Sequence, residues 1–270
     1  MMRFIITGHK GLIGRVLKKR LEYEENECIL AIDTRDKENP LDVRNLSKKE
    51  ISNIDILFHL ASNCKINKCI EDPAWAFENV EGIYNSLEFC RKNKIPKIVY
   101  FSSTRVLCPE KNTYTSSKLY GEELCRAYKK CYGIDYIIIR PSTVYGPGED
   151  TTKRLMAIFI ENAKTNRDLI IYGDKDKTLD FTYVDDFVEG VMLSLKEWNE
   201  DYDIAGDNEE KLIDVANEII FQTKSSSKIR FESPEIEQPQ KVKIDISKII
   251  GLGYRPQIKI KEGISKCLSD

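Results

Sequence analysis

Short apolar runs alternate with longer segments of helical periodicity through the first half of this chain. The runs that have the length and composition of strands are Arg3–Thr7, Cys28–Asp33, Ile54–Leu60, Lys97–Ser102 and Tyr136–Arg140. Several are apolar on both faces, as strands must be when a parallel sheet is buried between two layers of helices. Helical periodicity is clearest between them in Leu12–Leu21, Trp75–Asn93 and Tyr114–Cys131. The alternation predicts an α/β fold with a doubly wound parallel sheet over residues 1–145.

The second half of the chain, residues 146–270, has a less regular pattern and predicts a smaller lobe. Helices are expected at Arg154–Ala163, Val184–Leu195, Lys211–Phe221 and Lys261–Leu268. A lobe of this size that is broken by short loops has little core of its own. We therefore expect elements around residues 169–195, namely Leu169–Tyr172 and the helix from Val184, to return to the main sheet.

Charge and composition exclude several classes of partner. The chain has 42 Lys and Arg against 44 Asp and Glu, so its net charge of −2 offers no field that would recruit nucleic acid or an anionic membrane. The apolar runs are far shorter than the roughly 20 residues needed to cross a bilayer. Eight cysteines without Cys-x-x-Cys spacing, and only two histidines, predict free thiols and no metal site. We expect a cytoplasmic protein that acts on a small molecule.

A glycine-rich turn follows the first predicted strand. Gly8, Gly11 and Gly14 have the spacing G-x-x-G-x-x-G directly before a helix. The first glycine permits a sharp turn, the second lets the backbone approach a pyrophosphate, and the third lets the helix pack closely. Asp33 closes the second strand 19 residues beyond Gly14, where a carboxylate can bind both ribose hydroxyls and repel a 2′-phosphate. The pattern predicts a dinucleotide site that favours NAD over NADP, although Arg35 and Lys37 lie close to Asp33.

Together with later motifs, these residues resemble the extended short-chain dehydrogenase/reductase family, also called the NAD-dependent epimerase/dehydratase family. The motifs include His59-Leu60-Ala61-Ser62, Phe101-Ser102-Ser103-Thr104, Tyr114-x-x-x-Lys118 and Arg140-Pro141, and the resemblance covers nearly the whole chain. It implies a Rossmann-type sheet with a small, partly interleaved substrate lobe. The cofactor-binding residues that it implies are Gly8, Gly11, Leu12, Ile13, Gly14, Asp33, Thr34, Asp42, Val43, Leu60, Ala61, Ser62, Asn79, Ser102, Tyr114, Lys118 and Pro141.

Tyr114 and Lys118 are four residues apart near the start of a predicted helix, so both lie on one face. A lysine ammonium and an oxidised nicotinamide beside a tyrosine lower the pKa of its phenol from about 10. The phenolate can then remove a proton from a substrate hydroxyl, while hydride leaves the same carbon for the nicotinamide. The resemblance adds Thr104 as the residue that holds the substrate oxygen. A shift of one or two positions in the alignment with the family motif would give this role to Ser103 or Ser102 instead.

The residues after Thr104 bear on the reaction. Dehydratases of the family carry an acid pair there, whereas this chain has Arg105-Val106, which disfavours a dehydratase. Oxidation at one carbon followed by hydride return to the opposite face needs only Thr104, Tyr114, Lys118 and NAD. The leading hypothesis is therefore an NAD-dependent epimerase of a nucleotide-activated sugar.

Several departures from the family pattern keep other hypotheses open. Only nine residues separate Thr104 from Tyr114, Thr143 stands in place of a frequent asparagine, and Leu179 replaces an arginine that commonly meets the diphosphate. The segment around Pro239 lacks the family's second arginine. These features favour, as an alternative, an NAD-dependent dehydrogenase or reductase of a smaller alcohol or ketone. A nucleotide-binding regulatory or scaffold protein is a third hypothesis, against which the intact Thr104, Tyr114 and Lys118 argue.

The predicted helices Trp75–Asn93 and Tyr114–Cys131 resemble the pair that forms a four-helix dimer interface in much of the family. We therefore expect a homodimer. Apolar side chains on these helices, such as Leu87, Phe89 and Leu124, are equally explicable as core that faces the sheet.

Overall fold

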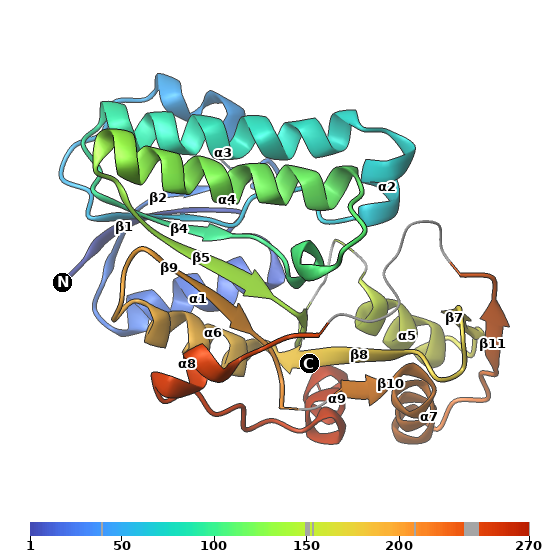
Figure 1. Ribbon diagram of the computed structural model, residues 1–270. Coiled ribbons are helices and arrows are strands. Elements are labelled where there is room, and N and C mark those ends of the chain that lie inside the picture. Colours follow the sequence, from blue (N-terminus) through green and yellow to red (C-terminus); the bar gives the residue numbers. More distant parts are fainter. Residues whose placement is uncertain (39, 149–151, 153, 208, 235–242, 270) are drawn as a thin grey trace.

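The computed structural model describes residues 1–269 except 39, 149–151, 153, 208 and 235–242. Its centre is a six-stranded sheet in the order β2-β1-β3-β4-β5-β9, and every neighbouring pair is parallel (Figure 1). The strands are β1 (Arg3–Thr7), β2 (Glu27–Ile32), β3 (Ile56–His59), β4 (Lys97–Phe101), β5 (Asp135–Pro141) and β9 (Glu200–Ile204). The predicted α/β fold with a parallel sheet is confirmed.

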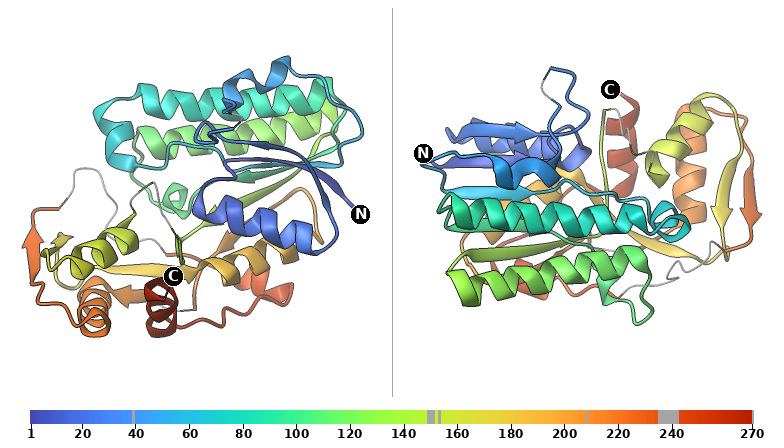
Figure 2. Two further views of the ribbon diagram at one scale, coloured as in Figure 1. Left: turned by 180° about the vertical axis from the view of Figure 1, so that it is seen from behind. Right: turned by 90° about the horizontal axis from the view of Figure 1, so that it is seen from above.

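Helices cover both faces of this sheet. One layer contains α2 (Ile66–Glu71), α3 (Ala74–Lys92) and α4 (Thr113–Tyr132), together with the 3₁₀ segment η1 (Val43–Lys48). The other contains α1 (Leu12–Tyr23), α6 (Val184–Ser194) and α8 (Ser247–Gly251). Figure 2 shows α3 and α4 side by side over the sheet. The helix that starts at Val184 thus packs against the main sheet, through β5 and β9.

Side chains on the two faces of the sheet belong to two separate apolar clusters. On β1, Phe4 and Ile6 belong to the cluster under α1 and α6, whereas Ile5 belongs to the cluster under α3 and α4. All three side chains are fully buried. This is the burial on both faces that the apolar runs indicate, because successive side chains of a strand point to opposite faces.

The C-terminal part builds two small sheets. One is ordered β10-β8-β6 and consists of β6 (Thr143–Tyr145), β8 (Thr178–Tyr183) and β10 (Glu209–Lys211). The other pairs β7 (Leu169–Tyr172) with β11 (Ile229–Glu232). Helices α5 (Leu155–Lys164), α7 (Leu212–Thr223) and α9 (Ile260–Leu268) pack around them.

One expectation about this part is wrong. Leu169–Tyr172 does not return to the main sheet, because β7 pairs with β11 instead. The strand that does return is β9, which pairs with β5 along Ile137–Pro141. Its sequence, Glu-Asp-Tyr-Asp-Ile, does not have the continuous apolar pattern of a buried parallel strand, because acidic residues alternate with the buried Tyr202 and Ile204.

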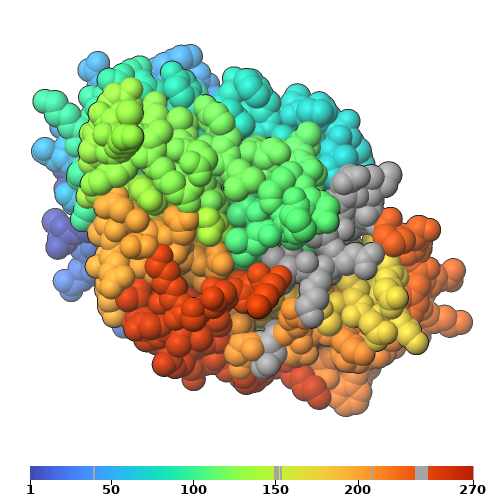
Figure 3. Space-filling view, viewed as in Figure 1, coloured from blue at the N-terminus to red at the C-terminus, as the bar shows by residue number. Residues whose placement is uncertain are grey.

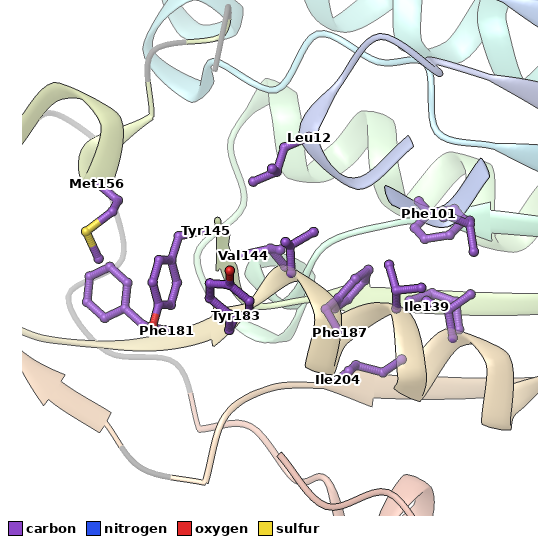
Figure 4. Packing of buried hydrophobic residues seen from close by; sticks show 14 of the residues in the cluster. Leu12, Phe101, Ile139, Val144, Tyr145, Met156, Phe181, Tyr183, Phe187 and Ile204 are labelled. Carbon is purple, nitrogen blue, oxygen red and sulfur yellow. The ribbon is translucent and has the colours of Figure 1, made fainter. Parts of the chain in front are cut away.

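Aromatic side chains connect the main sheet to the C-terminal part. Tyr145 packs edge-on against Phe181 and Tyr183, with ring centroids 6.0 and 5.6 Å apart. Figure 4 shows these rings continuing toward Phe187 and Ile204 under the main sheet. The space-filling view shows the two parts in contact across the molecule (Figure 3). One continuous core therefore holds the C-terminal part in place.

Candidate active site

The predicted cofactor-binding residues gather at the carboxyl edge of the main sheet. After β1 come Gly8, Gly11, Leu12, Ile13 and Gly14; after β2 come Asp33 and Thr34; after β3 come Leu60, Ala61 and Ser62. Because β1 lies between β2 and β3, successive connections leave toward opposite sides at this point. Doubly wound sheets bind ligands in the crevice at such a switch point.

The glycine turn is packed too closely to admit side chains. Gly8 has φ +76°, and a Cβ on it would lie 2.8 Å from the Ala61 nitrogen. A Cβ on Gly14 would lie 2.2 Å from the Gly8 carbonyl oxygen. Gly11 is the N-cap of α1, so the first amides of that helix open toward the turn. Backbone amides in such a cradle suit a pyrophosphate, and these residues fit NAD.

Thr7 ties the glycine turn to the end of β3. Its hydroxyl accepts hydrogen bonds from the backbone N–H groups of Leu60 at 3.2 Å and Ala61 at 3.1 Å. It also bonds His59 Nδ1 at 3.1 Å. Burial, and then the charge of Lys118, lowers the pKa of His59 to about 3. His59 is thus a neutral ring that supports the site.

Asp33 is buried at the end of β2, and both oxygens of its carboxylate accept hydrogen bonds. Its carboxylate accepts from the Lys10 backbone at 3.0 Å and from the Arg35 guanidinium at two positions, each at 2.9 Å. Burial acts to raise the pKa of Asp33, but the hydrogen bonds from Arg35 and Lys10 outweigh it and hold the pKa below its ordinary value. The carboxylate is therefore charged, and Arg35 covers the oxygens that the sequence assigns to the ribose.

Three further predicted cofactor residues brace the loops around the crevice. Asp42 caps η1 and accepts from the Arg44 backbone at 2.8 Å, and Val43 is the first residue of that segment. Asn79 on α3 accepts from the Asn63 backbone at 2.7 Å and donates back to its carbonyl at 3.1 Å. The amide of Asn79 thereby fixes the loop that follows Ser62.

The Ser102 hydroxyl points into the protein rather than toward the crevice. It is buried and donates to Glu122 of α4 at 2.6 Å. Arg140 also holds that carboxylate, with contacts of 2.8 and 2.6 Å. A hydroxyl that gives its proton to a buried carboxylate can still accept a hydrogen bond but has no proton left to donate to the cofactor, so cofactor binding by Ser102 stays a prediction. Pro141, also predicted, ends β5, and its carbonyl accepts from Thr104 at 3.1 Å.

The start of α4 sets the positions of Tyr114 and Lys118. Asn112 caps the helix in a reciprocal pair with Thr115, with both hydrogen bonds at 2.9 Å, so the helix begins at Thr113. Tyr114 then lies in the first turn and Lys118 one turn later. Lys118 Nζ lies 5.9 Å from the Tyr114 ring centroid and donates to the Phe101 carbonyl at 3.1 Å. The structure brings the two residues together as predicted.

Burial controls the electrostatics of this pair. Both side chains are at most 6% exposed. Desolvation lowers the pKa of Lys118 to about 8. It raises the pKa of Tyr114 well above its ordinary value, with Ser103 and Arg105 among the opposing influences. Loss of solvent therefore dominates around the phenol, and the lowering of its pKa by Lys118 together with oxidised NAD stays a prediction.

Ser103, not Thr104, meets the tyrosine. The Ser103 side chain interacts with Tyr114 and acts to lower its pKa, whereas the Thr104 hydroxyl donates to the Pro141 carbonyl. β4 ends at Phe101, and Thr104 already begins the 3₁₀ turn η2 (Thr104–Leu107), which rotates its side chain toward β5. The sequence places three hydroxyl residues in a row, and only the strand end and the turn decide which one faces α4.

A pocket opens beside Ser103, between the ends of β4 and β5 and the small sheet of β6, β8 and β10. Thr143 and Leu179, the residues that depart from the family pattern, are both part of its wall, and Pro239 lies outside the described residues. Asp180 and Arg105, which the sequence did not single out as site residues, also line it. Burial raises the pKa of Asp180 to about 6. The pocket therefore places polar groups beside Ser103, the residue that interacts with Tyr114.

The sequence profile of the NAD dependent epimerase/dehydratase family matches residues 4–205. The chain belongs to this family. Epimerase/dehydratase proteins of the family depend on NAD, and NAD is the cofactor of this chain. No helix in the described part of the chain is long and apolar enough to cross a membrane.

Individual relatives in the epimerase/dehydratase family span the full chain. A Methanocaldococcus jannaschii protein, provisionally named a UDP-glucose 4-epimerase, is 29% identical over 98% of this chain and 97% of its own length. The dTDP-glucose 4,6-dehydratase 1 of Escherichia coli is 25% identical over 98% of this chain and 91% of its own. The structure of Thermus thermophilus UDP-glucose 4-epimerase with NAD has a TM-score of 0.88 at 22% identity, covering 99% of this chain and 98% of that one. These relatives are named as epimerases and dehydratases of nucleotide sugars.

Proposed function

We propose that this protein is an NAD-dependent epimerase of a nucleotide-activated sugar. The observation that carries the proposal is the contact of Tyr114 with Ser103, next to a cationic Lys118 at the carboxyl edge of the NAD-binding sheet. No carboxylate follows Ser103, because the next two residues are Thr104 and Arg105. Elimination of water needs an acid and a base beyond the tyrosine, and inversion at one carbon does not.

Each residue has a distinct role in this proposal. Tyr114 takes the proton from the sugar hydroxyl as it is oxidised and returns it when the ketone is reduced. Ser103 holds the reacting oxygen and hydrogen-bonds the phenolate, which takes over the role that the sequence assigns to Thr104. Lys118, as a cation, favours the phenolate electrostatically. The glycine turn and Asp33 would hold NAD, which when bound would supply the hydride acceptor and donor.

The wall of the pocket supports a second candidate. Thr143 and Leu179 offer no guanidinium to a diphosphate, and the guanidinium donors that bind diphosphates bidentately are strong ones. A dehydrogenase or reductase of a smaller alcohol or ketone needs no such donors. The two functions differ in redox balance, since a dehydrogenase accumulates NADH and an epimerase does not.

One experiment separates these functions. Purified protein is incubated with NAD and UDP-, GDP- or dTDP-hexoses and hexuronic acids, while sugar protons are followed by NMR and NADH by absorbance near 340 nm. A new diastereomer without lasting NADH is expected. Tyr114→Phe removes the base and should lower kcat by about 10²–10⁴-fold with nearly unchanged NAD affinity. Stoichiometric NADH from small alcohols, with no change in any sugar, would replace the epimerase by a dehydrogenase.

We also propose that residues 146–270 form the substrate lobe, on a nucleotide-binding part of residues 1–145 completed by α6 and β9. The pocket supports this division, because β8 and β10 supply one wall and the ends of β4 and β5 in the main sheet supply the other. Cys90 and Cys125, which are both buried in the core, remain thiols. Reduced thiols are usual in the cytoplasm, which we propose as the location.

A homodimer through α3 and α4 completes the proposal. Leu87 and Phe89 are buried core, so they do not form this interface. The outer surface of the two helices instead exposes Phe77, Tyr84 and Tyr120, which are 61%, 47% and 44% exposed. Aromatic residues of this kind are enriched at protein interfaces. We assign this surface to a second copy of the chain.

A further inference from the structure

Two cysteines lie close to the proposed catalytic base, and the mechanism described above uses neither of them. Cys64 is exposed on the loop between β3 and α2, two residues after Ser62. Cys69 lies on α2 and is fully buried. Its side chain belongs to a small apolar cluster with Ala76 and Tyr114. One thiol is therefore open to solvent beside the cofactor loop, and the other is packed in the same cluster as the tyrosine.

The two cysteines are also close to each other. Cys69 Sγ lies 3.9 Å from the carbonyl oxygen of Asn63, and Cys64 is the next residue along the chain. Burial, and then the neighbouring Cys64, raises the pKa of Cys69 to about 11, so Cys69 is a thiol near neutral pH. After burial, Cys64 and Cys69 are the next influences on the pKa of Lys118, so both lie near its ammonium. Cys69 is fixed in a buried helix, and we therefore expect Cys64 on its surface loop to be the partner that moves.

The loop that carries Cys64 is held by hydrogen bonds in which the Cys69 thiol takes part. The Asn63 carbonyl accepts from the Asn79 side chain at 3.1 Å and from the Cys69 thiol. The Asn63 N–H donates back to Asn79 at 2.7 Å. Residues 60–62, which are predicted to bind the cofactor, come directly before Asn63 in the same loop. A change in the bonds of Asn63 therefore reaches the NAD site.

Exposure distinguishes this pair from the other neighbouring cysteines. Cys90 and Cys125 are both buried in the core, so a dissolved oxidant has no exposed thiol to attack there. In redox-sensing proteins an accessible cysteine is often placed next to a second cysteine that resolves its oxidised form. Disulfides in cytoplasmic proteins, where they occur, are usually transient ones of this kind. An exposed Cys64 next to a buried Cys69 has this arrangement.

We propose that Cys64 and Cys69 are a modification site for hydroperoxides, which convert them into a reversible disulfide that weakens NAD binding. The Cys64 sulfur attacks one oxygen of the peroxide, the O–O bond breaks, and a sulfenic acid forms as an alcohol or water leaves. The Cys69 sulfur then forms the S–S bond and displaces that oxygen as water. The two sulfurs lose two electrons in total, which the peroxide gains. Oxidation removes the S–H donor from the Asn63 carbonyl and draws the cofactor loop toward α2.

The test treats the purified protein with hydrogen peroxide and then removes the oxidant. The intact mass should fall by that of two hydrogen atoms. Trypsin cleaves after Lys65 and Lys68, so the two cysteines fall on separate peptides that only the disulfide joins. The NAD dissociation constant from calorimetry should rise about tenfold, and dithiothreitol should restore it. Cys64→Ser and Cys69→Ser should each abolish the cross-link, whereas Cys131→Ser, at another exposed cysteine, should retain it.

Other results overturn the inference in distinguishable ways. A disulfide to a different cysteine, or between two molecules, rejects the pair. A gain of oxygen at Cys64 without a cross-link rejects Cys69 as the resolving thiol. A cross-link that leaves the NAD affinity unchanged rejects the effect on the cofactor site. None of these measurements uses a sugar, so their failure is distinguishable from failure of the proposed epimerase activity.

Discussion

At the scale of single residues, Ser103 and Thr104 show how much depends on one position at a strand end. The two hydroxyls are neighbours in sequence, yet one contacts Tyr114 and the other donates to the Pro141 carbonyl. Only a group in contact with the tyrosine can hold the reacting oxygen and stabilise the phenolate together.

Substitution of these two residues tests the assignment. Ser103→Ala should lower kcat by about 10²-fold or more, as expected when a donor to the reacting oxygen is removed. Thr104→Val should leave kcat within a few fold, because its hydroxyl serves the backbone. Kinetics by NMR, with circular dichroism as the folding control, measures both. The reverse ranking would restore Thr104 as the catalytic hydroxyl.

We expect Asp33 to determine the preference for NAD over NADP. Asp33→Ser removes the charge that repels a 2′-phosphate and releases Arg35, which it holds at 2.9 Å, to bind that phosphate. NADP affinity relative to NAD should rise about tenfold, which corresponds to about 1.4 kcal/mol. Fluorescence titration with both cofactors measures the ratio. An unchanged ratio would show that another residue determines the preference.

We expect Lys118 to determine the alkaline limit of activity. Burial lowers its pKa to about 8, so the ammonium is present below that pH and is lost as the pH rises through it. If the reaction needs the cation, kcat should fall above about pH 8 rather than rise as a simple tyrosine base would. Lys118→Arg, whose charge persists, should be slower but lack this fall. A profile of the unaltered protein that continues to rise above pH 9 contradicts the assignment.

At the scale of elements, the contact between α1 and the glycine turn is set by backbone rather than by side chains. Gly14 lies against the Gly8 carbonyl, and Gly8 lies against Ala61, so turn, helix and β3 loop fit together only without Cβ atoms. The position of the α1 amides, and with it the phosphate cradle, follows from this packing.

Gly14→Ala should separate these elements. Its Cβ would meet the Gly8 oxygen at 2.2 Å, so the helix must shift. Overpacking of this kind costs about 1–3 kcal/mol of unfolding free energy, and NAD affinity should fall at least tenfold. Denaturant unfolding and NAD titration give the two values. Gly251→Ala on α8, where a Cβ meets nothing within 4 Å, is the matched control. Unimpaired NAD binding by Gly14→Ala would show that the cradle tolerates the shift.

At the scale of the whole molecule, one core supports both halves of the active site. Tyr145, Phe181 and Tyr183 belong to the same apolar cluster as Phe4 and Ile6 of β1. The pocket wall that carries Leu179 is therefore fixed relative to Tyr114 rather than tethered by a flexible linker. The layer of α3 and α4 lies on the other face of the main sheet from α1 and α6, and it carries the surface that we assign to a second copy of the chain.

The proposed dimer makes a prediction at this scale. Tyr84→Lys with Tyr120→Lys places two charges on the aromatic surface and should convert a dimer into a monomer of about half the mass, because unpaired charges are costly in an interface. Light scattering after size-exclusion chromatography reports the mass. Phe221→Lys on α7, where the side chain is 77% exposed, should leave the dimer intact. A monomeric unaltered protein at micromolar concentration would reject the interface.

Local patterns in the sequence were sufficient for the parallel sheet, the glycine turn and the Tyr114–Lys118 pair. These features depend on periodicity and on short spacings, which strand and helix geometry convert directly into faces and turns. The same reasoning failed for Leu169–Tyr172 and missed β9, because pairing of short strands depends on distant partners. Two acidic residues of β9, Asp201 and Asp203, pair with Arg140 of β5, a partner that is distant in sequence.

Tertiary structure alone decided the chemistry around Tyr114. It selected Ser103 among three consecutive hydroxyl residues, turned Ser102 toward Glu122, and placed Arg105 in the wall of the pocket. It also made burial, rather than the nearby lysine, the dominant influence on the pKa of the phenol. The direction of a side chain at a strand end and its exposure to water are set by elements far away in sequence, and no local pattern encodes them.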